Sequence, residues 1–331
     1  MSKQILQFQD FLYVEQETGI KIVGYLGSEN PLTIPETIND IPVTALGYCG
    51  EGNTDGITVK LNKSISCIDL DAIAFKNADI CGEDKNCWIT NVETSDDQPY
   101  FFAEKGMLYS KDKSVLIMCF NRESEKATIP QFVKTIGEYA FYACDEIEEV
   151  KLPNSISYVG DYAFSSNVTL KVSGKETELG NNVAGEIEIG ASNKYVLIGG
   201  CLLTADKTRL LKKVEASDTF EVPEGVEIID DEALGNFSVS NISLNNGLKK
   251  IGHNVFSRAN VKEIDIPSSV EYMESDAFSG YNTNIHINLL PGNQHYRLDG
   301  AVIYRIEDDG SETVFRVQNK AITQIELSSK V

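Results

Sequence analysis

The feature that most constrains the fold is a short pattern that recurs at a fixed spacing. The pattern is apolar-Pro-x-x-apolar-x-x-Ile-Gly-x-x-Ala-Phe, and its two clearest copies begin at Ile129 and Leu152, 23 residues apart. Further copies, 22 residues apart, begin at Val222, Leu244 and Ile266, and weaker ones begin at Ile34 and Leu61. A fixed period of this length is typical of a solenoid, in which each repeat forms one coil.

Each repeat has a physical interpretation. It opens on a short alternating run such as Val150-Lys151-Leu152, which predicts a strand with one buried face. The proline that follows has no N–H group and ends ladder pairing. We expect the glycine to adopt positive φ at a turn, and Ala-Phe to pack closely and fill the interior. One repeat cannot bury its own apolar face, so we predict stacked coils whose strands form one parallel sheet.

The pattern resembles the BspA-like branch of bacterial leucine-rich repeats. The resemblance covers nearly the whole chain, with the best copies at 128–172 and 220–287. It implies a β-rich leucine-rich-repeat solenoid with short parallel strands, turns or short helices, and inserted hairpins. We predict one solenoid over 1–331 rather than two domains.

A second, longer period adds β-hairpins to the coils. The segment Gly106–Ile117 places two alternating apolar strands around a Lys-Asp-Lys turn, which is a hairpin signature. We predict such insertions near 8–26, 100–120, 195–214 and 296–318. Whether they seal the solenoid or project as contact surfaces is open. A tyrosine precedes each of the three later hairpins, at Tyr100, Tyr195 and Tyr296.

The composition restricts the partners. The net charge of −21 argues against nucleic acid, which requires basic patches, and against anionic membrane surfaces. No apolar run is long enough to span a bilayer, so we expect no membrane insertion. The acidic surface favours solubility, and a specific cationic partner is the alternative.

The ends of the chain suggest two expectations about location and completeness. The first residues lack the uninterrupted apolar core of a signal peptide, so the protein is cytoplasmic or its signal has been removed. Ile325–Val331 resembles the opening strand of another repeat, so we expect a piece of a longer protein or end-to-end pairing.

The seven cysteines do not form a recognisable metal motif. Cys67, Cys119 and Cys144 fall at or beside apolar repeat positions, and we predict small buried side chains there. Cys81 and Cys87 bracket a polar loop; free thiols are favoured, and a local disulfide or a metal clip are the alternatives. Cys49 and Cys201 complete the set.

No pattern of catalytic residues is found. His253, His286 and His295 stand alone without a paired nucleophile, and we interpret them as polar residues. Asp308–Ser311 lacks the further ligands of a calcium loop and predicts a turn. We therefore expect no enzyme activity, no cofactor and no resident metal.

The outward residues of the predicted strands are the candidate binding residues. They should form one column, neutral or basic in its first half and mostly acidic in its second, unless it is simply a solvated sheet face. The column is Thr33, Lys60, Thr128, Lys151, Lys171, Glu188, Glu221, Ser243, Asp265, His286 and Glu326.

The function expected from the sequence is binding. The resemblance implies a cell-surface or secreted adhesion protein of a host-associated microbe, with host or bacterial proteins as ligands. Carbohydrate recognition is the alternative, and it would require Tyr100, Tyr195 and Tyr296 to form an exposed stacking platform.

Overall fold

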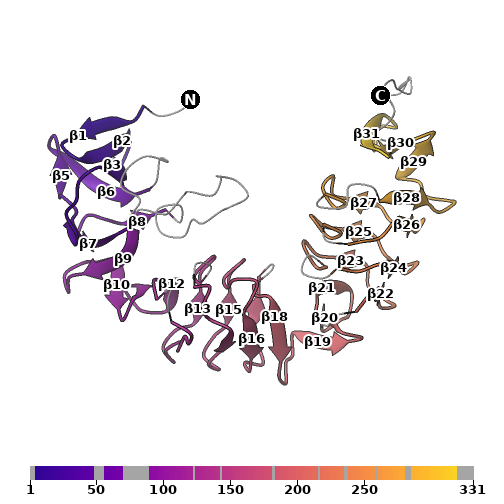
Figure 1. Ribbon diagram of the computed structural model, residues 1–331, viewed down its shortest axis with the longest axis horizontal. Helices are drawn as coiled ribbons and strands as arrows, with labels where there is room; N and C mark the ends of the chain where they lie inside the picture. Colours follow the sequence, from indigo (N-terminus) through magenta and orange to yellow (C-terminus); the bar gives the residue numbers. More distant parts are fainter. Residues whose placement is uncertain are drawn as a thin grey trace. The chain divides into compact units, whose positions relative to one another are not determined.

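The structure is a computed structural model, and its contacts divide the chain into two compact units, Met1–Gly190 and Ala191–Val331. It describes residues 4–47, 56–69, 89–121, 124–141, 144–180, 183–214, 217–234, 238–257, 259–279 and 285–318. The single solenoid over 1–331 remains a prediction, so each unit is described by itself. Figure 1 gives the order of the strands.

Unit 1 contains two kinds of parallel strand in each coil. The leading strands, half of which precede a Pro or Asn, pair as β4-β7-β9 and β14-β16-β18. The corner strands, most of which end at an apolar-Gly pair, pair as β6-β8 and β13-β15-β17. Their bounds are β4 Leu32–Thr33, β6 Ile41–Leu46, β7 Ile57–Leu61, β8 Cys67–Ile68, β9 Ile89–Thr94, β13 Thr135–Ile136, β14 Glu149–Lys151, β15 Tyr158–Val159, β16 Thr169–Val172, β17 Glu178–Leu179 and β18 Glu186–Ile189, with β5 Thr37–Ile38 antiparallel to β6.

Unit 2 repeats this arrangement. Its leading strands pair as β22-β24 and β26-β28, and its corner strands as β23-β25-β27. Their bounds are β22 Thr219–Glu221, β23 Ile228–Ile229, β24 Asn241–Ser243, β25 Lys250–Ile251, β26 Glu263–Ile266, β27 Tyr272–Met273 and β28 His286–Leu289. The solenoid prediction is confirmed, but the expectation of one parallel sheet is wrong, because each coil pairs with the next on two sides. Short helices are not found among the described residues.

The predicted hairpins are confirmed in position, and each is a three-stranded meander. The bounds are β1 Leu6–Phe8, β2 Phe11–Gln16, β3 Gly19–Tyr25; β10 Phe101–Glu104, β11 Met107–Ser110, β12 Val115–Cys119; β19 Tyr195–Ile198, β20 Cys201–Thr204, β21 Arg209–Lys213; and β29 Tyr296–Asp299, β30 Val302–Ile306, β31 Glu312–Val317. The third strands β3, β12 and β21 pair in parallel with the corner strands β6, β13 and β23, respectively. These meanders are therefore hydrogen-bonded into the coils.

The turn chemistry explains why the meanders recur. Two-residue turns join the first and second strands, and both turn residues have positive φ in Lys105-Gly106 and Gly199-Gly200. This geometry matches the right-handed twist of the flanking strands. All four meanders also have a register shift at the same place in the second strand.

The corner of each coil differs from the expectation in one respect. Positive φ is found at Tyr139, Tyr162 and Asn254, two residues after the glycine of the Ile-Gly pair, rather than at the glycine itself. The glycine is required for close approach instead: a Cβ added at Gly160 would lie 2.6 Å from the backbone nitrogen of Glu138 in the previous coil. The expected glycine turn is wrong for this reason.

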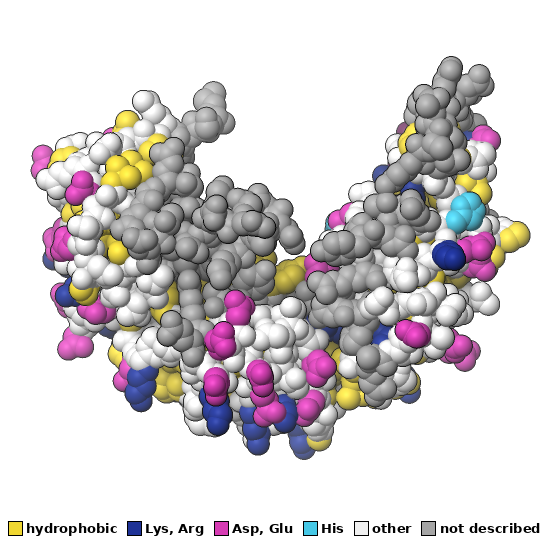
Figure 2. Space-filling model, in the orientation of Figure 1, with side chains coloured by type: hydrophobic (Ala, Val, Ile, Leu, Met, Phe, Trp, Pro, Cys, Tyr) yellow, Lys and Arg dark blue, Asp and Glu magenta, His cyan; other side chains and the backbone are white. Residues whose placement is uncertain are grey.

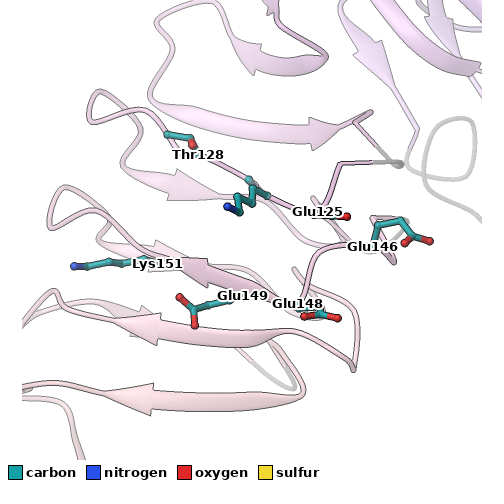
Figure 3. A pocket seen from close by; sticks show the side chains of 8 residues that line it. Glu125, Thr128, Glu146, Glu148, Glu149 and Lys151 are labelled. Carbon is teal, nitrogen blue, oxygen red and sulfur yellow. The ribbon is translucent and has the colours of Figure 1, made fainter.

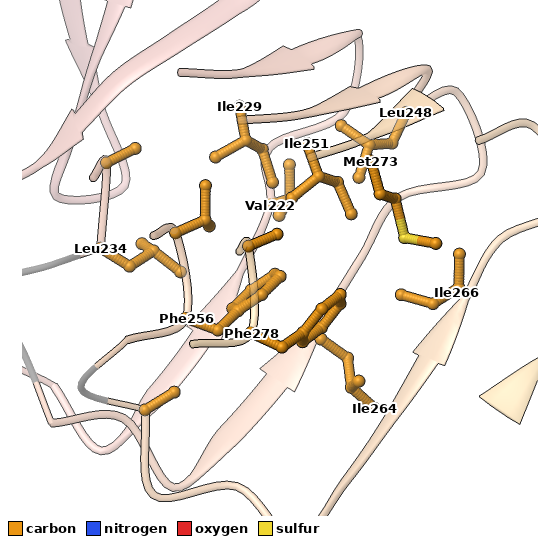
Figure 4. Packing of buried hydrophobic residues seen from close by; sticks show 14 of the residues in the cluster. Val222, Ile229, Leu234, Leu248, Ile251, Phe256, Ile264, Ile266, Met273 and Phe278 are labelled. Atoms are coloured by element: carbon orange, nitrogen blue, oxygen red, sulfur yellow. The ribbon is translucent and has the colours of Figure 1, made fainter. Parts of the chain in front are cut away.

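The interior consists of stacked equivalent side chains. Phe141 stacks on Phe164 at 4.8 Å, and Phe256 stacks on Phe278 at 5.0 Å, which confirms the filling role of the Ala-Phe pair. In unit 2 the corner residues Ile229, Ile251 and Met273 follow one another in register beside these rings (Figure 4). Each coil thus buries apolar surface that it could not bury alone.

Asparagine replaces the proline of the repeat in several coils. The side-chain amide of Asn245 donates hydrogen bonds to the carbonyl oxygens of Pro223 and Val226 in the previous coil, at 2.9 and 3.0 Å. Asn62 donates in the same way to Pro35 at 2.6 Å. The amide therefore joins consecutive coils where proline cannot.

Candidate interaction surface

The outward side chains of the leading strands form a surface that we call the strand face. In unit 1 the register places Thr33 beside Lys60, and Lys171 between Lys151 and Glu188. An isolated parallel β-bridge joins the backbones of Lys126 and Glu149 and sets the register of the preceding coil. Two residues further along both segments, Thr128 therefore lies opposite Lys151. Parallel register brings together residues that are about one repeat apart in the sequence.

In unit 2 the strand face has two rows rather than one column. Glu221 lies beside Ser243, and Asp265 lies beside Asn288. His286 pairs with Glu263 in the adjacent row, so its predicted place in the column of Asp265 is wrong by two residues. The alternation within Ile285-His286-Ile287 could not reveal this, because alternation defines a face and not a register. Glu326 lies outside the described residues.

Two of the three lysines in the basic half of the predicted column lie beside acidic side chains. Lys171 Nζ lies 2.6 Å from Glu149 Oε2 and 3.7 Å from Glu188 Oε2, and Lys60 Nζ lies 3.8 Å from Glu93 Oε2. The hydrogen bond that Lys171 donates to Glu149 raises the pKa of Lys171. Along this part of unit 1 acidic and basic side chains lie next to one another (Figure 2). Sequence reasoning missed Glu93 and Glu149, which only the cross-strand register pairs with these lysines.

The acidic half keeps its character. Glu221, Glu263 and Asp265 are exposed on the strand face of unit 2. The side-chain amide of Asn288 donates to Glu263 and, at 2.9 Å, to Asp265. This face therefore presents hydrogen-bond acceptors in a regular array.

A pocket opens on the strand face of unit 1. Its volume is about 650 Å³, and it is lined by Glu125, Lys126, Ala127, Thr128, Glu146, Glu148, Glu149 and Lys151. Thr128 and Lys151 lie at one end, and Glu125, Glu146 and Glu148 at the other (Figure 3). All the charged side chains of the lining are exposed. Because its lining contains both lysine and glutamate side chains, the pocket can accept charged groups of either sign.

The three tyrosines do not form a common platform. Tyr100 is 50 % exposed, whereas Tyr296 is 2 % exposed. The Met273 N–H donates to the Tyr296 hydroxyl oxygen at 2.7 Å, and burial raises the pKa of Tyr296 to about 12. The register also aligns Tyr195 and Tyr296 with Phe101 rather than with Tyr100. These three side chains therefore do not form the exposed stacking platform that carbohydrate recognition would require.

The cysteines and histidines contribute no reactive pair among the described residues. Cys119 and Cys144 are buried as predicted, and Cys67 is exposed and contradicts the prediction. Neither these three cysteines nor Cys201 forms a disulfide among the described residues. His253 Nδ1 lies 2.8 Å from Asp276 Oδ1. Partial burial acts to lower the pKa of His253, but the hydrogen bond and charge of Asp276 together with Glu274 raise it overall. Cys49, Cys81 and Cys87 lie outside the described residues.

Two further features concern metals and membranes. Over the described residues, no group of three or more His, Cys, Asp or Glu side chains could hold a metal ion. In the same part of the chain no helix has the length and apolar composition that crossing a membrane requires. Asp308–Ser311 forms the predicted turn, in which the Ser311 N–H donates to Asp309 Oδ1 at 2.9 Å.

Comparison with known families identifies the repeats. The family model described as BspA type leucine-rich repeat region matches residues 115–182 and 211–299 in six copies. No curated protein matches the sequence.

Several solved structures resemble the chain. A leucine-rich cell surface protein from Faecalibacterium prausnitzii is 17 % identical over 84 % of this chain and 86 % of its own, with a TM-score of 0.43. The pneumococcal vaccine antigen PcpA is 16 % identical over 88 % and 86 %, with a TM-score of 0.38. A leucine-rich repeat protein from Eubacterium ventriosum is 17 % identical over 82 % and 93 %, with a TM-score of 0.39.

Proposed function

We propose that this chain, which carries BspA-type leucine-rich repeats, is a non-catalytic scaffold that binds another protein through its strand face. The observation that carries the proposal is the register of the leading strands, which sets polar and charged side chains in fixed rows. Their positions are determined by backbone ladders over a buried core, so little ordering is required on binding. A surface or secreted location in a host-associated microbe fits a protein of this kind.

The chemistry of the strand face favours a protein ligand over a small molecule. The pocket around Lys151 is wide and its charged lining is exposed, whereas small-molecule sites are enclosed and mostly apolar. Rows of mixed charge suit a partner with complementary rows, because electrostatic complementarity selects partners and sets their orientation. Among the described residues we find no nucleophile beside a base, which favours a binding role over catalysis.

A charge-reversal experiment tests the strand face. Lys151 lines the pocket, and no ion pair of Lys151 is found among the described residues. We expect Lys151→Glu to weaken binding to an immobilised ligand drawn from a panel of fibronectin, laminin, fibrinogen and collagen, measured by biolayer interferometry. Lys175→Glu, at an exposed turn away from the strand face, makes the same charge change and should leave binding unchanged.

Two results would contradict the proposal. Equal loss of binding in Lys151→Glu and Lys175→Glu would indicate a general charge effect. If Lys151→Glu and a separate Glu188→Lys variant both bind as the wild type does, the strand face of unit 1 is excluded as the binding surface. A glycan array used in parallel tests carbohydrate recognition, and selective glycan binding with no protein binding would replace the proposal.

A further inference from the structure

Aromatic side chains gather at the surface of unit 1 around the meander β10-β11-β12. Tyr100 is 50 % and Phe132 42 % exposed, and Phe102 is half-buried. The buried ring of Tyr109 lies 6.1 Å from Phe102 and 5.7 Å from Phe132, the second in an edge-on contact, and Tyr100 is two residues before Phe102. We call these four residues the aromatic patch.

The fold does not require this patch. Pro130 is followed two residues later by Phe132, whereas the same place in six other repeats holds a small residue: Thr37, Ser64, Ser155, Gly225, Gly247 and Ser269. In the third meander, β19-β20-β21, Val196 occupies the place of Phe102. Since the coils form without these aromatic rings, their exposure at this one place is a local feature and not a packing need.

Lysines lie among the rings. Lys113 Nζ is 3.6 Å from the centroid of Phe102 and 5.8 Å from that of Phe132. The Lys134 N–H donates to the Ser114 carbonyl at 2.8 Å, which places Lys134 beside the turn that carries Lys113. Asp112 in that turn accepts hydrogen bonds from Ser110 and Ser114. Over the described residues, neither lysine is found in an ion pair, so the patch is locally basic on a chain of net charge −21.

We propose that the aromatic patch with Lys113 and Lys134 is a second docking site, which binds an acidic segment of a partner protein through one apolar side chain. Exposed aromatic rings are the groups that most often anchor protein partners, and they lose little side-chain entropy on binding. The lysines beside them match carboxylates on either side of the apolar anchor. The patch lies on other elements than the strand face, and the inference holds whether or not the strand face binds a ligand.

Labelled peptides test the site. The probe is the fluorescent peptide Glu-Asp-Glu-Phe-Glu-Asp-Glu, and its two controls carry serine in place of phenylalanine or lysine in place of every acid. We expect the acidic phenylalanine peptide to bind best in fluorescence anisotropy. Phe132→Ser should lower the affinity for this peptide by about tenfold or more, since hot-spot truncations have effects of this size. The variant introduces the residue that Ser155 provides in the next coil, so the fold should be retained.

Matched variants separate this site from the strand face. Lys113→Ala should weaken binding of the acidic phenylalanine peptide, while Lys175→Ala and the strand-face variant Lys151→Glu should leave that binding unchanged. The proposal is overturned if the phenylalanine and serine peptides bind alike, or if Phe132→Ser binds as the wild type does. It is also overturned if Phe132 supports binding of heparin or polygalacturonate but of no peptide, or if sedimentation shows that Phe132 mediates self-association of this chain.

Discussion

Glycine at the corner of a coil acts by its size. The backbone of the previous coil passes so close to Gly160 that a methyl group has no room, and the left-handed residue is Tyr162. Tyr162 stacks on Tyr139 of the previous coil at 5.4 Å, so the unfavourable backbone conformation is accompanied by a ring contact. The repeated Gly is thus a contact requirement between coils.

Gly160→Ala should destabilise unit 1. A Cβ at 2.6 Å from the Glu138 nitrogen forces two coils apart, and overpacking of this kind costs roughly 1–3 kcal/mol in the free energy of unfolding. Urea denaturation followed by circular dichroism measures the change. Gly190→Ala is the control, because its nearest new contact is an ordinary 3.4 Å from the Val172 oxygen. Equal stability of the two variants would refute the contact argument.

Lys212 is a buried charged residue of strand β21. It is 3 % exposed, and burial lowers its pKa to about 8, although the charge of Glu232 acts to raise it. Met118 occupies the equivalent place in unit 1, since Met118 pairs with Leu108 as Lys212 pairs with Leu202. An apolar side chain therefore suits this position of the meander.

We expect Lys212→Met to raise the stability of unit 2 at pH 7, by an amount on the order of 2 kcal/mol. The unfolded chain holds this proton up to about pH 10.4, and the folded chain only to about 8. Between these values the unfolded state binds more protons, so wild-type stability gains with rising pH and the advantage of the variant shrinks. Thermal unfolding at several pH values from 6 to about 9.5 measures this; a constant difference would contradict the explanation.

At the scale of the element, consecutive coils are joined by side chains as well as by strands. Proline ends the leading strand in some coils, while Asn62 and Asn245 end it in others and donate to carbonyls of the previous coil. Sequence reasoning gave these asparagines no role of their own. The structure gives them one, which depends on carbonyl groups about one repeat away.

Asn245→Ala should destabilise unit 2 by roughly 1–3 kcal/mol, because the carbonyl of Val226 loses the Asn245 donor and the carbonyl of Pro223 retains a long 3.3 Å hydrogen bond from the Val226 N–H. Asn246→Ala is the control: Asn246 is adjacent and exposed, and its removal should change stability by less than about 0.5 kcal/mol. The unfolding free energies of both variants can be measured in the same urea series. If Asn246→Ala costs as much as Asn245→Ala, the inter-coil bond is not the cause.

Across the whole molecule, charge is the dominant property. The chain carries −21, and the ion pairs of the strand face use only part of its acids. Self-repulsion of this size opposes folding but keeps copies apart. Local pairs and long-range repulsion respond to salt in opposite directions, so a salt titration can separate them.

We expect the melting temperature to rise by a few degrees when ionic strength increases from about 0.01 M to about 0.15 M, because the Debye length shortens from about 30 Å to about 8 Å. Differential scanning fluorimetry measures the shift. A variant with Glu125, Glu148 and Glu271 changed to glutamine is the control: these acids are found in no ion pair over the described residues, and the shift should become smaller. A melting temperature that falls with salt would mean that local pairs dominate.

Local patterns determined much of the fold. The 22- and 23-residue spacing predicts coils because only stacked repeats bury their apolar residues, and the apolar-Gly and Ala-Phe pairs predict which side chains fill the interior. The turn-flanked apolar runs predict the meanders, although not their first strands. All of these properties depend on residues within one repeat.

The tertiary structure decided what depends on contacts between coils. Register placed Asn288, not His286, beside Asp265, and brought Glu149 beside Lys171, which neutralises part of the predicted basic half of the column. It also buried Tyr296 and left Phe132 exposed on Tyr109. A sequence specifies which residues alternate along one strand, but the neighbour across a ladder is set by how two coils stack, and charge and exposure follow from that neighbour.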